Sequence, residues 1–86
     1  MTFDYRKLEE DLTQLLAAMT SLAPSEVSEV REFLAAGEYG VAFETLCGII
    51  KEESKPVPKD VRRKIRELAE RMKIDPTWWA GISNGE

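Results

Sequence analysis

The side chains that most often do chemistry in enzymes are scarce in this sequence. It contains no histidine and a single cysteine, Cys47. General acid–base catalysis relies most often on histidine, and a cysteine nucleophile needs a neighbouring base to activate it. The adjacent carboxylates of Glu9 and Glu10, or of Glu52 and Glu53, point to different sides of a helix and cannot work as a pair. We therefore expect a protein that is not an enzyme.

Metals, cofactors and disulfides are limited by the same scarcity. Without histidine and with one cysteine, the chain lacks the usual ligands of zinc, and no metal site is expected. No glycine-rich loop follows a predicted strand, so we expect no nucleotide cofactor. A single cysteine cannot form a disulfide within the chain, so stability depends on packing alone. Cys47 falls on a helical apolar stripe, where a small buried residue fits.

The length and hydropathy of the chain predict one helical domain over residues 1–86. With 86 residues, 43% of them apolar, it can build a single core without disulfides or a structural metal. No apolar run approaches the roughly 20 residues needed to span a bilayer, and residues 1–5 lack the basic start of a secretory signal. The expectation is a soluble, cytoplasmic protein with no membrane partner, present as a monomer or weak homodimer.

The net charge of −4 hides a difference between the two parts of the chain. Residues 1–53 carry eleven acids and four bases, a balance of −7, whereas residues 54–86 carry five acids and eight bases, a balance of +3. An acidic half repels phosphate and attracts basic surfaces. The charge pattern therefore favours a basic protein partner over nucleic acid.

Two amphipathic helices meet at residues 35–42, around which the rest of the chain is organised. Gly37 suits the position just past the first of these helices, because glycine adopts positive φ without a clash. Glu38 then opens the second helix, where a negative charge meets the positive end of the helix dipole. So short a connection predicts a hairpin of two helices lying side by side.

Apolar spacing predicts helices over about residues 3–20, 25–36, 38–53, 58–73 and 76–82, with a proline-containing linker at 54–58. The fold class is therefore all-α, a small antiparallel bundle of four helices plus a short C-terminal helix. Phe33, Leu46 and Leu68 are expected in the core.

Several positions carry more local expectations. Tyr5 falls on the apolar stripe of the first helix, and Asp11 is assigned to its polar side. Ser25 is the predicted N-cap of the second helix. Gly48, in the middle of a helix, marks a close approach by another backbone or a bulky side chain. Of the two adjacent tryptophans, one is expected to seal the core beside Ile82 at i+4, and the other to be partly exposed.

A helix-turn-helix DNA-binding regulator is the first alternative, over residues 61–82. Ala69 and Ile74 occupy positions where that motif has a small and an apolar residue. Lys73, however, stands at the turn position that usually holds glycine. The second helix is short and lacks a base-reading side chain before Asn84, and the acidic remainder of the chain opposes DNA. A generic helical adaptor is the other alternative.

Residues 27–74 combine the distinctive turn Gly37-Glu38-Tyr39-Gly40 with an apolar pattern that many helical bundles share. The pattern comprises Val30, Phe33, Leu34, Val41, Ala42, Leu46, Ile49 and Ile50, then a proline-containing linker and Ile65, Leu68, Ala69, Met72 and Ile74. It resembles the MafI family of bacterial immunity proteins, small helical proteins that protect a cell from a secreted polymorphic toxin. Phe43, where such proteins often have leucine, is a departure. The first helix and the Trp78-Trp79 tail lie outside the matched pattern.

The resemblance implies an immunity protein whose partner is the C-terminal domain of a cognate toxin, often a nuclease with a basic surface. Such a protein would bind the toxin domain and block its active site or substrate groove. An acidic, enzymatically inert helical protein suits that partner by charge complementarity. The residues we expect at the contact are those of the acidic segment 26–44: Glu26, Glu29, Glu32, Glu38, Tyr39 and Glu44.

Overall fold

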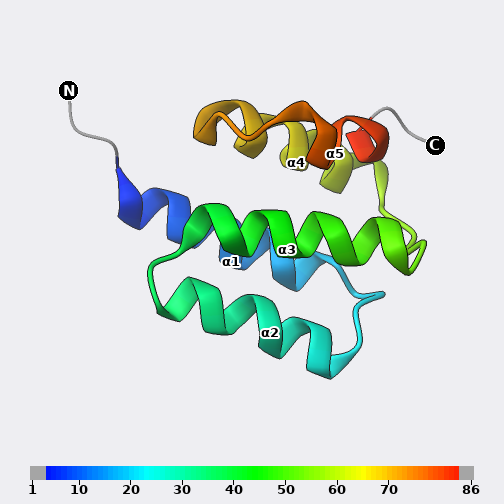
Figure 1. Cartoon of the computed structure of the whole chain (residues 1–86), viewed down its shortest axis with the longest axis horizontal. Coiled ribbons are helices and arrows are strands. Elements are labelled where there is room, and N and C mark those ends of the chain that lie inside the picture. Colours follow the sequence, from blue (N-terminus) through cyan, green and yellow to red (C-terminus); the bar gives the residue numbers. More distant parts are fainter. Residues whose placement is uncertain (1–3, 84–86) are drawn as a thin grey trace.

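A computed structural model describes residues 4–83 and confirms an all-α fold (Figure 1). Its helices are α1 (Tyr5–Ala18), α2 (Pro24–Ala35), α3 (Tyr39–Glu52), α4 (Lys59–Met72) and α5 (Pro76–Ser83). The described residues contain no strand. The predicted boundaries were right to within about two residues wherever they can be compared, while residue 3 lies outside the described residues. None of the described helices is long and apolar enough to cross a membrane.

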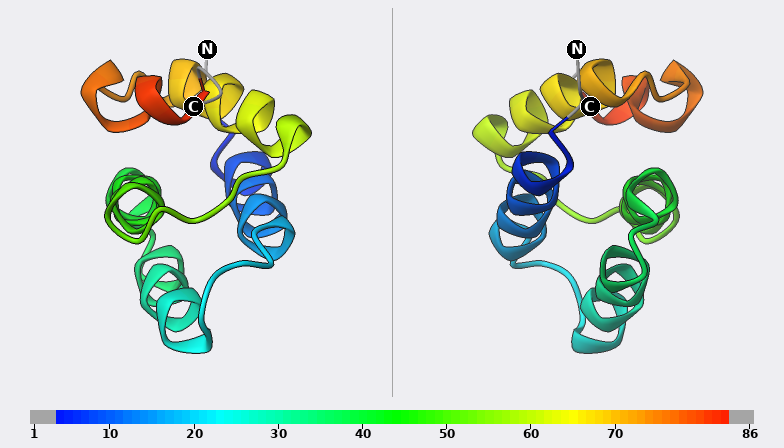
Figure 2. Two further views of the ribbon diagram at one scale, coloured as in Figure 1. Left: turned by 90° about the vertical axis from the view of Figure 1, so that its right-hand side faces the viewer. Right: turned by 90° about the vertical axis from the view of Figure 1, so that its left-hand side faces the viewer.

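The helices form three layers, seen end-on in Figure 2. The α4–α5 hairpin forms one outer layer, α1 and α3 form the middle, and α2 lies on the opposite side. Between the layers, α2 packs against α3, α4 against α1, and α5 against α3, while α4 and α5 pack most extensively against each other. Successive helices α1, α2 and α3 run in alternating directions, as short connections between neighbours require (Figure 1).

The core collects apolar side chains from all five helices. Leu46 and Leu68 are buried as predicted, but Phe33 is only half-buried and packs against the edge of the core. The prediction for Phe33 was wrong because α2 is an outer layer whose main neighbour is α3. Part of its apolar stripe therefore stays at the rim.

The α2–α3 turn has the predicted glycine cap. Gly37 adopts φ +77, its N–H donates to the Leu34 carbonyl at 3.0 Å, and the Glu38 N–H donates to the Phe33 carbonyl at 2.9 Å. These two bonds are the Schellman pattern that satisfies the last carbonyls of a helix. Glu38 is the N-cap and not the first helical residue, because α3 begins at Tyr39, and its side chain makes no capping bond.

The start of α2 differs from the prediction. Its N-cap is Ala23, Pro24 is the first helical residue, and Ser25 lies inside the helix. The Glu26 carboxylate accepts a hydrogen bond from the Ala23 N–H at 2.8 Å. A glutamate at the third helical position thus takes over the capping that we assigned to a serine hydroxyl.

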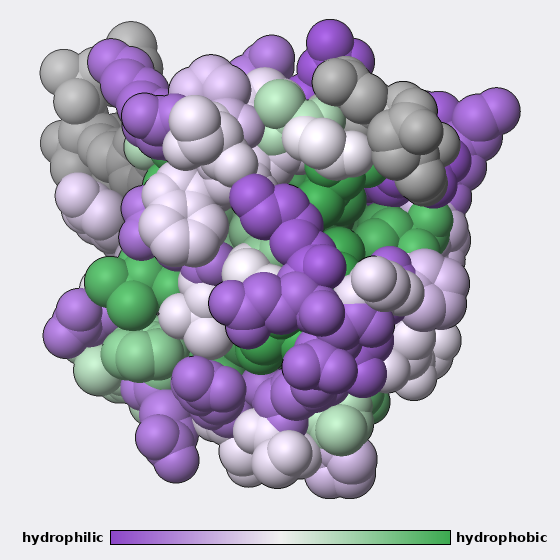
Figure 3. Space-filling model, turned by 45° about the vertical axis from the view of Figure 1, so that its right-hand side comes forward, coloured by the Kyte–Doolittle hydropathy of each residue, from purple (hydrophilic) through white to green (hydrophobic). Residues whose placement is uncertain are grey.

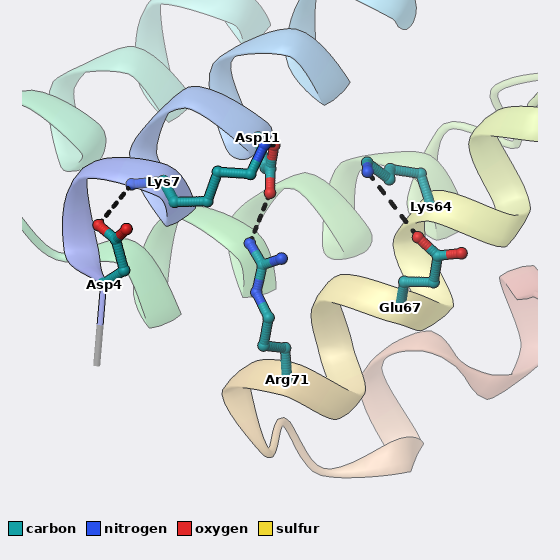
Figure 4. A network of polar contacts seen from close by, with 6 residues as sticks. All are labelled: Asp4, Lys7, Asp11, Lys64, Glu67 and Arg71. Carbon is teal, nitrogen blue, oxygen red and sulfur yellow. Dashed lines mark hydrogen bonds and ion pairs between the residues drawn. The ribbon is translucent and has the colours of Figure 1, made fainter. Parts of the chain in front are cut away.

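Two residues of α1 lie in places that the helical stripe did not predict. Tyr5 is 59% exposed, whereas Asp11 is only 2% exposed. Asp11 follows Leu8 by three residues and precedes Leu15 by four, so it lies within the apolar stripe and not opposite it. Its carboxylate accepts a 2.7 Å hydrogen bond from the Arg71 guanidinium and lies 3.4 Å from the Lys7 ammonium (Figure 4).

The two tryptophans have different environments. The Trp79 ring packs against the core, and its indole N–H donates to the Ile74 carbonyl at 3.0 Å. Trp78, the residue four before Ile82, is 37% exposed and therefore does not seal the core as the i+4 relation suggested. Its Cζ3 lies 3.9 Å from where a Cβ on Gly48 would stand. A bulky side chain therefore packs over Gly48, as predicted, but at an ordinary contact distance that leaves room for a Cβ.

Candidate functional site

The predicted contact residues separate into groups on the folded chain. Glu29 and Glu32 are both exposed on α2, and neither forms an ion pair with any described residue. They are three residues apart, so they lie on one side of the helix. We call this pair the acidic face. Arg31 is also exposed on α2, so the face is acidic on balance and not uniformly so.

Glu26 lies one helical turn before Glu29 but is half-buried and bound within the chain, and Glu44 lies on another helix. Besides capping α2, the Glu26 carboxylate lies 3.1 Å from the Lys55 ammonium, and the pKa of Glu26 is lowered chiefly by the hydrogen bond from the Ala23 N–H. Glu44 is half-buried and lies one helical turn before Gly48, on the flank of α3 that faces α5. Glu26 therefore has an intramolecular role, and Glu44 belongs to a different side of α3.

Tyr39 joins α3 to α1. Its hydroxyl donates to the Glu9 carboxylate at 3.2 Å, and its ring stacks on Tyr5 with centroids 6.1 Å apart and planes 29° apart. The pKa of Tyr39 is raised, first by burial and then by the negative charge of Glu9. The two rings thus form a fixed aromatic pair at the start of α1 and α3.

A groove of about 630 Å³ lies beside this aromatic pair. It is formed by the first turns of α1 and α3, the α2–α3 turn and the α4–α5 turn, and we call it the tyrosine groove. Its volume falls in the range of about 300–1,000 Å³ that is usual for ligand pockets. The lining residues are Tyr5, Leu8, Gly37, Glu38, Tyr39, Gly40, Val41, Arg71, Met72, Lys73 and Ile74.

The tyrosine groove combines exposed apolar surface with charges of both signs. Two of its residues, Tyr5 and Val41, are among the few large hydrophobic side chains that are exposed in the described part of the chain. Glu38 is exposed and forms no ion pair with a described residue. Arg71 is bound to Asp11, so its charge is largely compensated. Lys73 also lines the groove, is exposed and forms no ion pair with a described residue, so it offsets the charge of Glu38. The groove therefore suits an apolar side chain flanked by charges of both signs.

Sequence reasoning found Glu38 and Tyr39 but missed the rest of the groove. Tyr5 was assigned to the core because its spacing fits the apolar stripe, although the stripe extends past the end of the buried layer. Tyr5 lies four residues before Glu9, so the two side chains share one side of α1. This spacing indicates that the apolar stripe becomes polar at its N-terminal end, where the Tyr39 hydroxyl binds Glu9. The contribution of Met72 and Ile74 depends on how α4 crosses α1, which no local pattern specifies.

Comparison with protein families, with curated proteins and with solved structures gives no match. The resemblance to the MafI immunity proteins remains a hypothesis based on the turn and apolar pattern of residues 27–74.

One of the objections to a helix-turn-helix is weaker in the folded chain. Lys73 adopts the left-handed conformation, with φ 59 and ψ 43, that glycine normally provides at this turn. The second helix, α5, has eight residues, and its Trp78 ring and the Thr77 carbonyl both contact α3. No arginine, asparagine or glutamine lies in α5, so it presents none of the usual base-reading side chains.

Metal binding has no candidate among the described residues. No group of three or more histidine, cysteine, aspartate or glutamate side chains there could hold an ion. The described surface offers the acidic face, the Tyr5–Tyr39 pair and the tyrosine groove as candidate contact sites.

Proposed function

We propose that this chain is an immunity protein that binds a basic toxin domain through the acidic face and the adjoining tyrosine groove. The observation that carries the proposal is that Glu29, Glu32 and Glu38 are exposed and form no ion pair with a described residue. Glu29 and Glu32 precede the α2–α3 turn in the chain, and Glu38, within that turn, lines the groove. Glu38 therefore lies beside the apolar surface of the groove.

Each part of this surface has a separate role in binding. Uncompensated acids steer a basic partner and raise the association rate, with modest effect on the final affinity when they stay at the rim. An aromatic or aliphatic side chain of the partner, inserted between Tyr5 and Val41, supplies the buried anchor that typically dominates an interface. The identity of the partner as a nuclease follows from the MafI resemblance alone. Binding over its substrate groove would block its activity.

The test is protection of cells that express the toxin domain encoded next to this chain. The variant Glu29→Lys with Glu32→Lys should lose protection and slow association, because the steering charge is reversed while no core contact changes. Glu52→Lys with Glu53→Lys is the matched control, since these acids are also exposed and form no ion pair with a described residue. Both variants change the net charge from −4 to 0.

The two variants should differ in protection and agree in their circular dichroism spectra. Equal protection by both would show that the acidic face takes no part in binding. Equal loss by both would show that only the net charge matters. Tyr39→Phe is a further variant, because it removes the bond to Glu9 without removing the ring.

A DNA-binding regulator is the alternative that the conformation of Lys73 keeps open. Its discriminating variant is Lys59→Gln with Arg63→Gln, because both side chains are exposed on α4 and have no ion-pair partner among the described residues. Protection that survives this change supports the immunity proposal. Salt-dependent DNA affinity that the same change abolishes supports the regulator.

A further inference from the structure

A second groove lies at the other end of α3, away from the tyrosine groove. It has a volume of about 490 Å³ and is formed by the end of α3, the linker before α4, the first turn of α4 and the end of α5. We call it the basic groove. Its lining residues are Ile50, Lys51, Ser54, Lys55, Pro56, Val57, Arg62, Gly81 and Ile82.

The charge of the basic groove is opposite to that of the chain. Sixteen acids and twelve bases give the chain a net charge of −4, yet the groove is lined by Lys51, Lys55 and Arg62 and by no acid. Lys55 is compensated by Glu26 at 3.1 Å. Lys51 and Arg62 are therefore the positive charges that can bind an anionic ligand, because neither forms an ion pair with a described residue.

Lys51 and Arg62 are held in place by backbone carbonyls. The Lys51 ammonium donates to the Thr77 carbonyl at 2.8 Å, and the Arg62 guanidinium donates to the Val57 carbonyl at 3.0 Å. Each group has further donors besides the one in use. Both cations are thus positioned before a ligand arrives, which lowers the entropy lost on binding.

Apolar surface lies between these cations. Ile50 and Ile82 are buried and close the bottom of the groove, whereas Val57 is half-buried and Pro56 exposed. Figure 3, which looks toward this end of the molecule, shows hydrophobic surface among hydrophilic side chains. A ligand in the groove therefore meets aliphatic surface as well as positive charge.

We propose that the basic groove binds an acidic peptide segment, with carboxylates at Lys51 and Arg62 and an aliphatic side chain against Val57. The Lys51 ammonium is held by a carbonyl of α5, and the Arg62 guanidinium by a carbonyl of the linker. A ligand that carries several anionic groups along a chain reaches both, which favours a peptide over a small single anion. This inference concerns a second surface and is independent of the proposed toxin contact.

The same observations disfavour single-stranded nucleic acid as the occupant. Proteins that bind single strands combine cations with aromatic side chains on which bases stack. No aromatic residue lines the basic groove. Aliphatic surface beside lysine and arginine fits leucine- or isoleucine-containing acidic sequences instead.

The experiment measures fluorescence anisotropy of a dye-labelled panel of decapeptides with the full chain. Each peptide contains aspartate and glutamate around two aliphatic residues; the comparison probes are decaglutamate and a single-stranded deoxythymidine decamer. We expect an acidic aliphatic peptide to bind in the micromolar range and decaglutamate at least about tenfold more weakly, because it cannot use the apolar surface.

The variant Lys51→Gln with Arg62→Gln should weaken peptide binding about tenfold. Lys59→Gln with Arg63→Gln is the matched control, because it removes the same charge from α4 cations outside the groove and should bind like wild type. Circular dichroism verifies the fold of each variant. A Val57→Ser variant tests the apolar contact without removing charge.

Three results would overturn the proposal. The first is that no acidic aliphatic peptide binds below millimolar concentration. The second is equal binding of decaglutamate, or equal loss in both charge variants, which would reduce the effect to general electrostatics. The third is tighter binding of the deoxythymidine decamer than of any peptide, which would identify the groove as a nucleic-acid surface.

Discussion

The Arg71 guanidinium of α4 donates a 2.7 Å hydrogen bond to the Asp11 carboxylate of α1, sixty residues earlier in the chain. This contact joins the outer α4–α5 layer to the middle layer (Figures 2 and 4). Asp11 is the one charged residue in the described part of the chain that is buried. Arg71 also lines the tyrosine groove, so the pair both holds the bundle together and fixes one wall of the groove.

The Asp11–Arg71 pair should show strong asymmetry under mutation. Arg71→Met leaves a buried carboxylate with Lys7 as its remaining partner, which should lower the free energy of unfolding by about 3 kcal/mol. Adding Asp11→Leu should restore most of this loss, because the position lies within a leucine stripe. Urea denaturation of both single variants and the double variant measures the coupling. Additive losses would show that the two side chains do not interact.

Acid should destabilise the protein through the same carboxylate. The hydrogen bond from Arg71 is the largest cause that lowers the pKa of Asp11 in the folded chain. A lowered pKa gives stability that is fully present above the unfolded value, about 3.9, and is lost as pH falls toward the folded value. The pKa values of Glu26 and Asp75 are lowered as well, each first by a backbone hydrogen bond, and act in the same direction.

The Asp11→Leu/Arg71→Met variant isolates the contribution of the Asp11–Arg71 pair. Its free energy of unfolding, measured in urea from pH 6 down to pH 2, should fall less steeply below about pH 4 than that of the wild type. Parallel curves would mean that Asp11 titrates normally in the folded chain.

The helices were well predicted because each can be recognised from residues that lie close together in the sequence. Apolar spacing and Gly37 after α2 are local features. Asp75 before α5 is another, because its carboxylate accepts a hydrogen bond from the Thr77 N–H at 2.9 Å, only two residues away. Asp11 and Tyr5 were misplaced because their environments depend on α4 and on the first turn of α3. Helical periodicity says which residues share a side, and not where the neighbouring helix ends.

The left-handed residues that follow α2 and α4 should respond oppositely to mutation. Gly37 has φ +77 with open space around a Cβ, so Gly37→Ala should destabilise through backbone strain alone, by about 1 kcal/mol. Lys73 occupies the same region with φ 59, so Lys73→Gly should relieve backbone strain. Glycine also raises the entropy of the unfolded state, which offsets part of this gain, and the net stabilisation should be about 0.5 kcal/mol. Thermal melts should therefore shift down by about 4–8 °C and up by about 2–4 °C. Shifts of the same sign would contradict the two caps.

The candidate contact residues were only partly predictable from the sequence, for a related reason. An exposed acid is recognisable as polar, but whether it is paired depends on the three-dimensional neighbourhood. Glu26 is bound by Ala23 and Lys55, whereas Glu29, in the same helix, has no such partner among the described residues. The basic groove was missed altogether, because its cations belong to three segments that only the folded chain brings together.

Gly48 should accept a methyl group and reject a larger side chain. A Cβ there would stand 3.9 Å from Trp78 Cζ3, an ordinary contact distance. Gly48→Ala should stabilise by about 1 kcal/mol, because alanine favours the helix. Gly48→Leu should displace the Trp78 ring, lower the melting temperature and shift the tryptophan emission to longer wavelength. An alanine variant less stable than wild type would show that the ring packs closer than this.

Cys47 should report directly on unfolding. Its side chain is fully buried, and burial raises the pKa of its thiol to about 12. Alkylating agents attack the thiolate, so at pH 8 the folded chain should be protected. The unfolded thiol ionises near its ordinary pKa of about 8.5. Stability should therefore fall as pH rises from about 9 toward 12, because the unfolded state then releases a proton that the folded state keeps.

Iodoacetamide labelling followed by mass spectrometry measures this protection. Labelling of the native chain should be slower than that of the urea-unfolded chain by the factor of the unfolding equilibrium, provided that opening and closing are faster than alkylation. Arg71→Met, expected to lose about 3 kcal/mol, should then be labelled about a hundredfold faster than wild type. Gly48→Ala should be labelled more slowly. Labelling rates that are the same in both variants and in wild type would show that Cys47 is exposed by local opening, which does not break the contact between α1 and α4.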